Sequence, residues 1–197
     1  MARNVFISFR FSDGHRYKDA LSALFDQNQD TVDYSEDEDR SDMSDETIRD
    51  YLYKKLRRSS ITIVLLTPQA LNHKKNRLGK YDDWMYDEIR YSLENRENNR
   101  PNGLIAVYTP KAAGVLIKKS SNGIRTVNHV DNLFRKNMMN VKASYKKESE
   151  AGVFDAAYDS YCSLVPYNSF VNNIGKYIEI ASKKRDEIHK YNIVKRM

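Results

Sequence analysis

The stretch ITIVLLT, residues 61–67, is the clearest β-strand in the sequence. It is rich in β-branched residues and leucine, and Pro68 ends it. A strand that is apolar at nearly every position has both of its faces covered, which is the usual state of a strand in a parallel sheet. This stretch therefore predicts an α/β fold in which helices cover both faces of a parallel sheet.

The segments on either side of this strand alternate between strand and helix. Three further apolar runs predict strands, at residues 4–9, 31–35 and 103–109. Three helices are predicted between the strands, at about 13–28, 44–58 and 82–97. Asp13 is predicted to cap the first of these helices. Strict alternation of this kind implies parallel strands joined by right-handed crossovers.

The pattern weakens beyond Pro110. Residues 111–157 are polar and punctuated by glycine, and we interpret them as an insertion with one short helix at 131–139. A last strand is expected at 160–167 and a closing helix at about 170–191. Because there is no internal repeat and no second apolar core, residues 1–197 are predicted to form a single domain.

Composition and charge exclude several classes of protein. No apolar run approaches the roughly 20 residues of a membrane span. The single cysteine, Cys162, and the lack of a signal peptide predict a cytoplasmic protein. The net charge is +6, although residues 26–50 hold eleven acidic residues against two arginines. Lysines scattered over solvated helices explain the positive excess, and we do not expect a nucleic-acid partner.

Motifs for metals and common cofactors are missing. The histidines lack the spacing of metal ligands: His15, His73, His129 and His189. There is no glycine-rich phosphate loop, so a dinucleotide cofactor held on a helix start is unsupported. No serine or cysteine stands in a catalytic arrangement with histidine, and we expect Cys162 to be buried.

The only tryptophan of the chain stands one helical turn before a glutamate, in WMYDEI, residues 84–89. At 100° per residue, the side of this helix that faces the sheet carries Met85, Ile89, Ser92 and Leu93. A neighbouring stripe carries Trp84, Glu88 and Tyr91.

Glu88 is therefore predicted at the edge of the buried surface, near the carboxyl end of the strand 61–67, where open parallel sheets bind ligands. An indole beside a half-buried carboxylate suits a ligand with a flat ring and hydroxyl groups. Alternatively, Trp84 fastens the helix to a loop and Glu88 pairs with a lysine. Helix geometry alone leaves both interpretations open.

Three motifs carry a resemblance to a known family. VFISFRFSD, residues 5–13, resembles the first strand and following loop of Toll/interleukin receptor (TIR) domains. ITIVLLTPQAL, residues 61–71, resembles their third strand and its turn, and WMYDEI matches their tryptophan-x-x-x-glutamate pattern. The order of the three motifs agrees across residues 4–109. The chain thus resembles the bacterial TIR-like family that includes the ThsB component of Thoeris anti-phage systems.

The resemblance implies a fold and an activity. The fold would be a flavodoxin-like three-layer α/β sandwich with a mainly parallel sheet. The activity would be cleavage of NAD, as substrate and not as cofactor, at the nicotinamide–ribose bond. In ThsB-like members the ADP-ribose becomes a cyclic signal that activates a partner effector. Self-assembly through TIR surfaces and a phage-derived trigger are further expectations.

The same resemblance implies roles for individual residues. Glu88 would be the catalytic carboxylate, holding the ribose hydroxyls and stabilising the positive charge of an oxocarbenium-like transition state. Phe9 and Arg10 would stack on and orient the nucleotide, and Trp84 would wall the pocket.

Two further residues, Ser8 and Tyr34, are considered for the pocket. Ser8 is either a pocket hydroxyl or an ordinary strand residue. Tyr34 is an expected substrate contact at the start of the loop 34–44, which in TIR domains gates the site and mediates assembly. The acidity of that loop departs from many members of the family and argues against a direct role of the loop in substrate binding.

Two other functions remain open. A non-catalytic TIR module would use the acidic loop to meet basic surfaces of another copy. A receiver-like domain on the same fold is disfavoured, because a receiver needs acidic residues where the first strand ends, and this chain has Phe9, Arg10 and Phe11 there.

Overall fold

The structure is a computed structural model of the 197-residue chain. It describes residues 3–27, 31–33, 45–71, 84–95, 100–121, 125–128, 130, 132–146, 155 and 157–196. The loop 34–44, together with Tyr34, lies outside these residues.

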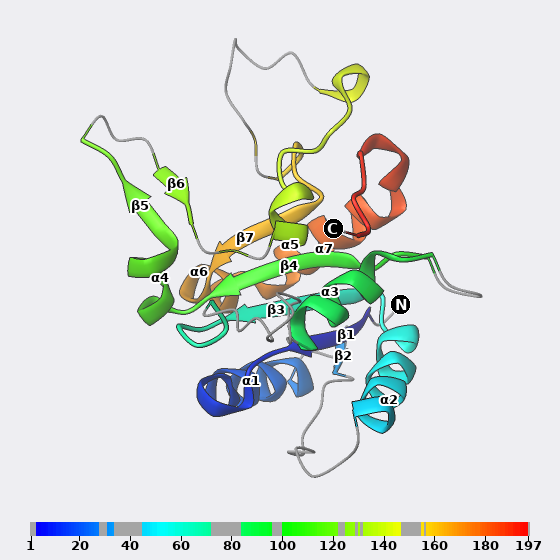
Figure 1. The fold of residues 1–197 in the computed structure, drawn as a ribbon, viewed down its shortest axis with the longest axis vertical. Helices are drawn as coiled ribbons and strands as arrows, with labels where there is room; N and C mark the ends of the chain where they lie inside the picture. The colour runs from blue at the N-terminus through cyan, green and yellow to red at the C-terminus, as the bar shows by residue number, and fades with distance from the viewer. Residues whose placement is uncertain are drawn as a thin grey trace.

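A parallel sheet forms the centre of the molecule (Figure 1). Its order is β2-β1-β3-β4-β7 within the described residues, and every neighbouring pair is parallel. The strands are β1 (Arg3–Ser8), β2 (Thr31–Asp33), β3 (Ile61–Leu66), β4 (Gly103–Tyr108) and β7 (Cys162–Pro166). All six residues of β3 are buried, which confirms that the apolar run 61–67 marks a strand covered on both faces.

Helices cover both faces of this sheet. One face packs against α1 (Phe11–Asp26), α6 (Tyr167–Asn172) and α7 (Ile174–Asp186), through Leu21, Phe25, Phe170 and Ile178. The other packs against α2 (Asp45–Arg58), α3 (Trp84–Leu93) and α5 (Asn132–Lys136), as Figure 1 shows for α3. The flavodoxin-like three-layer α/β fold is therefore confirmed.

The strand order fixes where a ligand site is expected. The chain passes from β1 outward to β2, then returns across β1 to β3 and continues in the other direction. In open sheets of this order, ligands bind outside the carboxyl ends of the strands where the direction reverses, here between β1 and β3.

The interval 111–157, interpreted as an insertion, contains more structure than the sequence indicates. The predicted short helix is confirmed as α5, over five residues. In addition, α4 (Pro110–Leu116) follows β4 directly, and β5 (Ile117–Lys119) pairs antiparallel with β6 (Arg125–Val127). Figure 1 shows this hairpin projecting from the sheet. A 3-10 turn, η1 (Ala143–Tyr145), completes the interval.

Several predicted boundaries are wrong. The closing helix is two helices, because the backbone at Asn173 leaves the helical region with φ −144° and ψ 39°, and a separate turn, η2 (Ile188–Lys190), follows. The helix predicted over 82–97 is described only from Trp84 to Leu93. Asp13 is not the cap of α1: Arg10 occupies the N-cap position, without a side-chain capping bond, and Asp13 lies inside the first turn.

Two further findings on these described residues concern membrane spans and the single cysteine. Among the helices in these ranges, none has both the length and the apolar character that a bilayer span requires. Cys162 is a buried free thiol, as expected.

Candidate functional site

Ser8, the last residue of β1, lies where the sheet order reverses. Val5 and Ile7 pack on the α1 side, whereas Phe6 packs against α2 and α3. Because side chains alternate along a strand, Ser8 shares the α2/α3 side with Phe6. Its side chain is 1% exposed, and its hydroxyl oxygen makes no hydrogen bond within the described part of the chain. A buried hydroxyl in this state calls for an explanation such as a bound ligand or water.

Glu88 lies on the same side of the sheet, and only 8% of it is exposed. Two contacts of the last turns of α3 locate it. Tyr91 packs with Phe6 of β1, and the Ser92 hydroxyl lies 2.8 Å from the hydroxyl of Thr62 in β3. The helix therefore crosses the boundary between β1 and β3.

The position of Glu88 along the sheet follows from these contacts. α3 runs antiparallel to the strands, since the Asn102 amide just before β4 donates to the carbonyl of Ser92. Glu88 is four residues before Ser92, about 6 Å nearer the carboxyl edge of the sheet. Ser8 is two residues beyond Phe6, about 6.6 Å nearer the same edge. Glu88 and Ser8 therefore lie at a similar position along the strands, on the same side of the sheet and near the point where β1 and β3 end.

Phe9 and Arg10 follow β1 at the same edge. Phe9 packs on the α1 side, where a Cβ on Gly14 would lie 3.2 Å from the Phe9 Cβ, so the start of α1 sits tightly on this ring. The Phe9 ring also lies near Phe11, at a centroid distance of 6.1 Å. Arg10 is half-buried at the N-cap of α1. Trp84 is the first residue of α3, and its side chain lies outside the described part of the structure.

Asp13 joins the two loops that border this edge, a role that the sequence analysis missed. One carboxylate oxygen accepts a hydrogen bond from the Thr67 hydroxyl at 2.6 Å, and the other accepts from the Gln69 amide at 3.0 Å. The Thr67 hydroxyl oxygen in turn accepts from the Ala70 amide at 3.2 Å. Asp13 thus ties the start of α1 to the turn after β3. The only signals for this role in the sequence are an acid shortly after β1 and a threonine directly after β3.

Removal of this carboxylate is expected to destabilise the fold. Asp13→Ala should lower the free energy of unfolding by about 1–3 kcal/mol, because two hydrogen bonds to a charged group are lost. Urea denaturation measures the change. Asp19→Ala is the matched control on the same helix: its side chain is 53% exposed and pairs with His15 at 2.7 Å, so a much smaller loss is expected. Equal losses in the two variants would contradict the role of Asp13.

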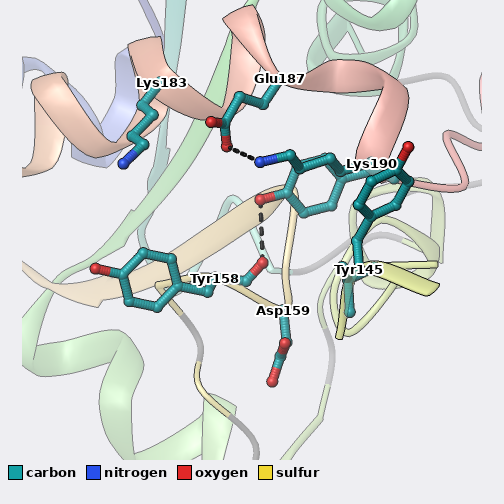
Figure 2. Close-up of a pocket in the computed structure, with 8 residues that line it drawn as sticks. Tyr145, Tyr158, Asp159, Lys183, Glu187 and Lys190 are labelled. Carbon is teal, nitrogen blue, oxygen red and sulfur yellow. Dashed lines mark hydrogen bonds and ion pairs between the residues drawn. The ribbon is translucent and has the colours of Figure 1, made fainter. Parts of the chain in front are cut away.

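Two separate cavities lie at the opposite, amino edge of the sheet. Figure 2 shows the residues that line the smaller one. The volumes of the two cavities are about 260 Å³ and 120 Å³, and both cavities are lined by Tyr158, Lys183, Glu187 and Tyr191. Glu187 pairs with Lys190 at 3.0 Å, and the Tyr191 hydroxyl donates to the Tyr158 carbonyl at 3.0 Å. The walls come from η1, α7 and the segment before β7, which are distant in sequence. The sequence analysis did not predict these cavities, and none of its site residues lines them.

Lys184 lines the larger cavity and is buried; its amino group donates to the Ser163 hydroxyl at 2.8 Å. Burial lowers the pKa of this lysine to about 8, against the opposing influence of Cys162 and Asp155. Between pH 8 and the ordinary lysine pKa of 10.5, the unfolded chain therefore binds more protons at this position than the folded chain. The contribution of Lys184 to stability must then rise with pH across this interval.

This linkage predicts a pH-dependent difference between the wild type and Lys184→Met. From pH 8 to 9, the wild type should gain up to about 1.4 kcal/mol per pH unit relative to the variant. Urea unfolding at a series of pH values measures it. Burial also raises the pKa of the Cys162 thiol, but this thiol is present in both proteins, so its contribution is common to the two stability curves. A difference that stays constant with pH would contradict the lowered pKa.

Within the described ranges, no three side chains of histidine, cysteine, aspartate or glutamate are grouped as metal ligands. His15 is engaged with Asp19, and its ring lies edge-on to Phe11 at a centroid distance of 4.7 Å.

Two comparisons relate the chain to known proteins. Residues 6–114 match the family described as Thoeris protein ThsB, TIR-like domain. This segment runs from β1 to α4 and includes Ser8, Asp13 and Glu88. A solved structure is also similar, described as the activated Roq1 resistosome directly recognizing the pathogen effector XopQ (TIR domains). The similarity has 19% sequence identity and a TM-score of 0.38, and it covers 58% of this chain and 62% of that chain.

Proposed function

The chain belongs to the family of the Thoeris protein ThsB TIR-like domain, and from this premise we propose that it is an enzyme that cleaves NAD. The bond broken would be the one between nicotinamide and ribose. The ADP-ribose part would be released as a signal, in cyclic form, that activates a defence effector against phage. A phage-derived trigger and self-assembly would control the reaction.

The observation that carries this proposal is that Glu88 and Ser8 are both buried, on the same side of the sheet and near the point where the sheet order reverses. As the glycosidic bond breaks, its electron pair leaves with nicotinamide, and the ribose acquires positive charge. A fixed carboxylate on the ribose side stabilises that charge, and a site shielded from water strengthens the effect. Water or a group of the same nucleotide then captures the ribose carbon.

The neighbouring residues supply binding rather than bond breaking. The Ser8 hydroxyl would hydrogen-bond to the substrate, which would satisfy a buried polar group that has no bond within the described chain. Arg10 would contact the pyrophosphate, for which a guanidinium is suited by its paired donors. Phe9, Trp84 and Tyr34 would contact the flat rings of NAD.

The test is incubation of the purified protein with NAD, with nicotinamide and the ADP-ribose products followed by chromatography and mass spectrometry. The reaction is run over a range of protein concentrations, with and without extract from phage-infected cells. We expect nicotinamide and a cyclic product in equal amounts. If no condition releases nicotinamide, including those in which the protein assembles, the non-catalytic interaction module is the correct interpretation.

A further inference from the structure

A buried chain of hydrogen bonds lies under the last turn of α3, at the amino end of the sheet. It links Asn102, Thr62 and Ser92, all fully buried. The Asn102 side-chain amide donates to the Thr62 hydroxyl oxygen at 3.0 Å. The Ser92 hydroxyl donates to the Glu88 carbonyl at 2.7 Å, and the Thr62 and Ser92 oxygens are 2.8 Å apart.

The direction of this chain follows from its ends. The Ser92 hydroxyl hydrogen is used on the carbonyl of Glu88, so Ser92 accepts from Thr62. Thr62 accepts in turn from the Asn102 amide. Each hydroxyl therefore donates once and accepts once, with no alternative arrangement inside the chain. Such a fully satisfied buried network specifies one arrangement of the elements that it joins.

Asn102 is itself fixed on several sides. The second hydrogen of its side-chain amide is donated to the Ser59 hydroxyl at 2.8 Å. Its backbone carbonyl accepts a hydrogen bond from the Tyr161 hydroxyl at 2.7 Å. Its backbone amide donates to the Ser92 carbonyl at 2.7 Å. α3 also packs on the sheet through the apolar side chains of Met85, Ile89 and Leu93. Apolar packing is not directional, whereas the hydrogen bonds that Thr62, Ser92 and Asn102 make between α3 and the sheet are, so we take these bonds to set the position of the helix along β3.

We propose that Thr62 and Ser92 are positioning residues that fix α3 along the sheet and thereby hold Glu88 on the same side of the sheet as Ser8, near the point where β1 and β3 end. Their effect on turnover rests on the proposed NAD cleavage. Their effect on the placement of α3 does not. Displacement of a catalytic group by about 1 Å can cost about a hundredfold in rate, so a small shift of the helix is sufficient to reduce turnover.

The test compares Thr62→Val with Ser59→Ala. Each removes one hydroxyl that accepts from the Asn102 amide. The Thr62 hydroxyl also bonds to Ser92 of α3, whereas the Ser59 hydroxyl donates to the Leu56 carbonyl at the end of α2. For Thr62→Val we expect kcat for nicotinamide release to fall at least about tenfold, with KM changed less than about twofold. Thr62→Ser should restore kcat to within about twofold, and Ser59→Ala should leave it unchanged.

A second readout needs no catalysis. Trp84, the only tryptophan of the chain, is the first residue of α3, so its fluorescence reports on this helix. The emission maximum and acrylamide quenching should change in Thr62→Val and not in Thr62→Ser or Ser59→Ala. Ser92→Ala replaces Thr62→Val if the latter does not fold. Unchanged fluorescence in both Thr62→Val and Ser92→Ala, or an equal loss of kcat in Ser59→Ala, would overturn the proposal. A wild type that releases no nicotinamide refutes the proposed function, and fluorescence then decides the positioning role alone.

Discussion

Replacement of Glu88 by glutamine is expected to reduce nicotinamide release from NAD by about 10²- to 10³-fold. Glutamine has nearly the same size and keeps a hydrogen-bonding oxygen, but it removes the negative charge that would stabilise the ribose cation. Glu88 is 8% exposed, so this charge would act in a poorly solvated site where electrostatic effects are large. The initial rate of nicotinamide release, at saturating NAD and equal protein concentration, measures the effect.

Glu94→Gln is the matched control for this experiment. Glu94 follows α3 directly and its carboxylate binds Arg90 at 2.8 Å and Arg196 at 3.2 Å, away from the Ser8 edge. Its replacement should leave nicotinamide release unchanged. Both variants should unfold near the wild-type temperature. If Glu88→Gln and Glu94→Gln retain equal activity, Glu88 is not the catalytic carboxylate.

The fold was predictable because its strands are signalled by local sequence. The apolar runs at 61–67 and 103–109 correspond to strands that are buried at every position except Tyr108, and alternation with helices already implies a parallel sheet. The order of the strands is a different matter. It depends on which strands pair across the sheet, and only the resemblance of residues 4–109 to TIR domains indicated it. The short strands β5 and β6 were missed because three-residue strands carry almost no periodic pattern.

The candidate site was predictable only in part. Helix periodicity predicted a half-buried Glu88 at the border of the buried side of α3, whereas the structure buries this residue to 8% exposure. Asp13 was misassigned as a helix cap, since capping is the common local role of an acid there, whereas its partners Thr67 and Gln69 are more than fifty residues away. The hydrogen bond of Thr62 to Ser92 was not predictable either. Threonine is common in strands because of its β-propensity, so its presence in an apolar strand does not indicate a buried polar contact.

The break of the closing helix has a similar cause. Apolar residues recur at helical spacing on both sides of Asn173, among them Val171, Ile174 and Ile178, so the pattern predicts one continuous helix. The structure divides it because α6 must follow the end of β7 while α7 returns along the sheet over β4. Tertiary packing therefore determines the break at Asn173, which the local spacing of apolar residues does not indicate.

The close packing of α7 against β4 predicts the largest effect of a single substitution on stability. Gly103, the first residue of β4, is buried directly beneath the helix. A Cβ at this position would lie 2.5 Å from the carbonyl oxygen of Ala181 and 2.9 Å from its carbonyl carbon. These are backbone atoms of a helix, so no side-chain rotation relieves the overlap. Gly103→Ala should therefore force α7 away from β4, at a cost of about 3 kcal/mol.

Thermal unfolding tests this expectation, with Tm lowered by about 6–12 °C for a chain of this size. Gly175→Ala in α7 and Gly114→Ala in α4 are the matched controls, because an added Cβ meets no atom within 4 Å at either position. Both should be neutral or stabilising, by up to about 1 kcal/mol. The double variant Gly103→Ala with Ala181→Gly should recover little, since the overlap is with the Ala181 backbone. Full recovery would mean that the side chain of Ala181, and not the helix backbone, limits the approach of α7 to the sheet.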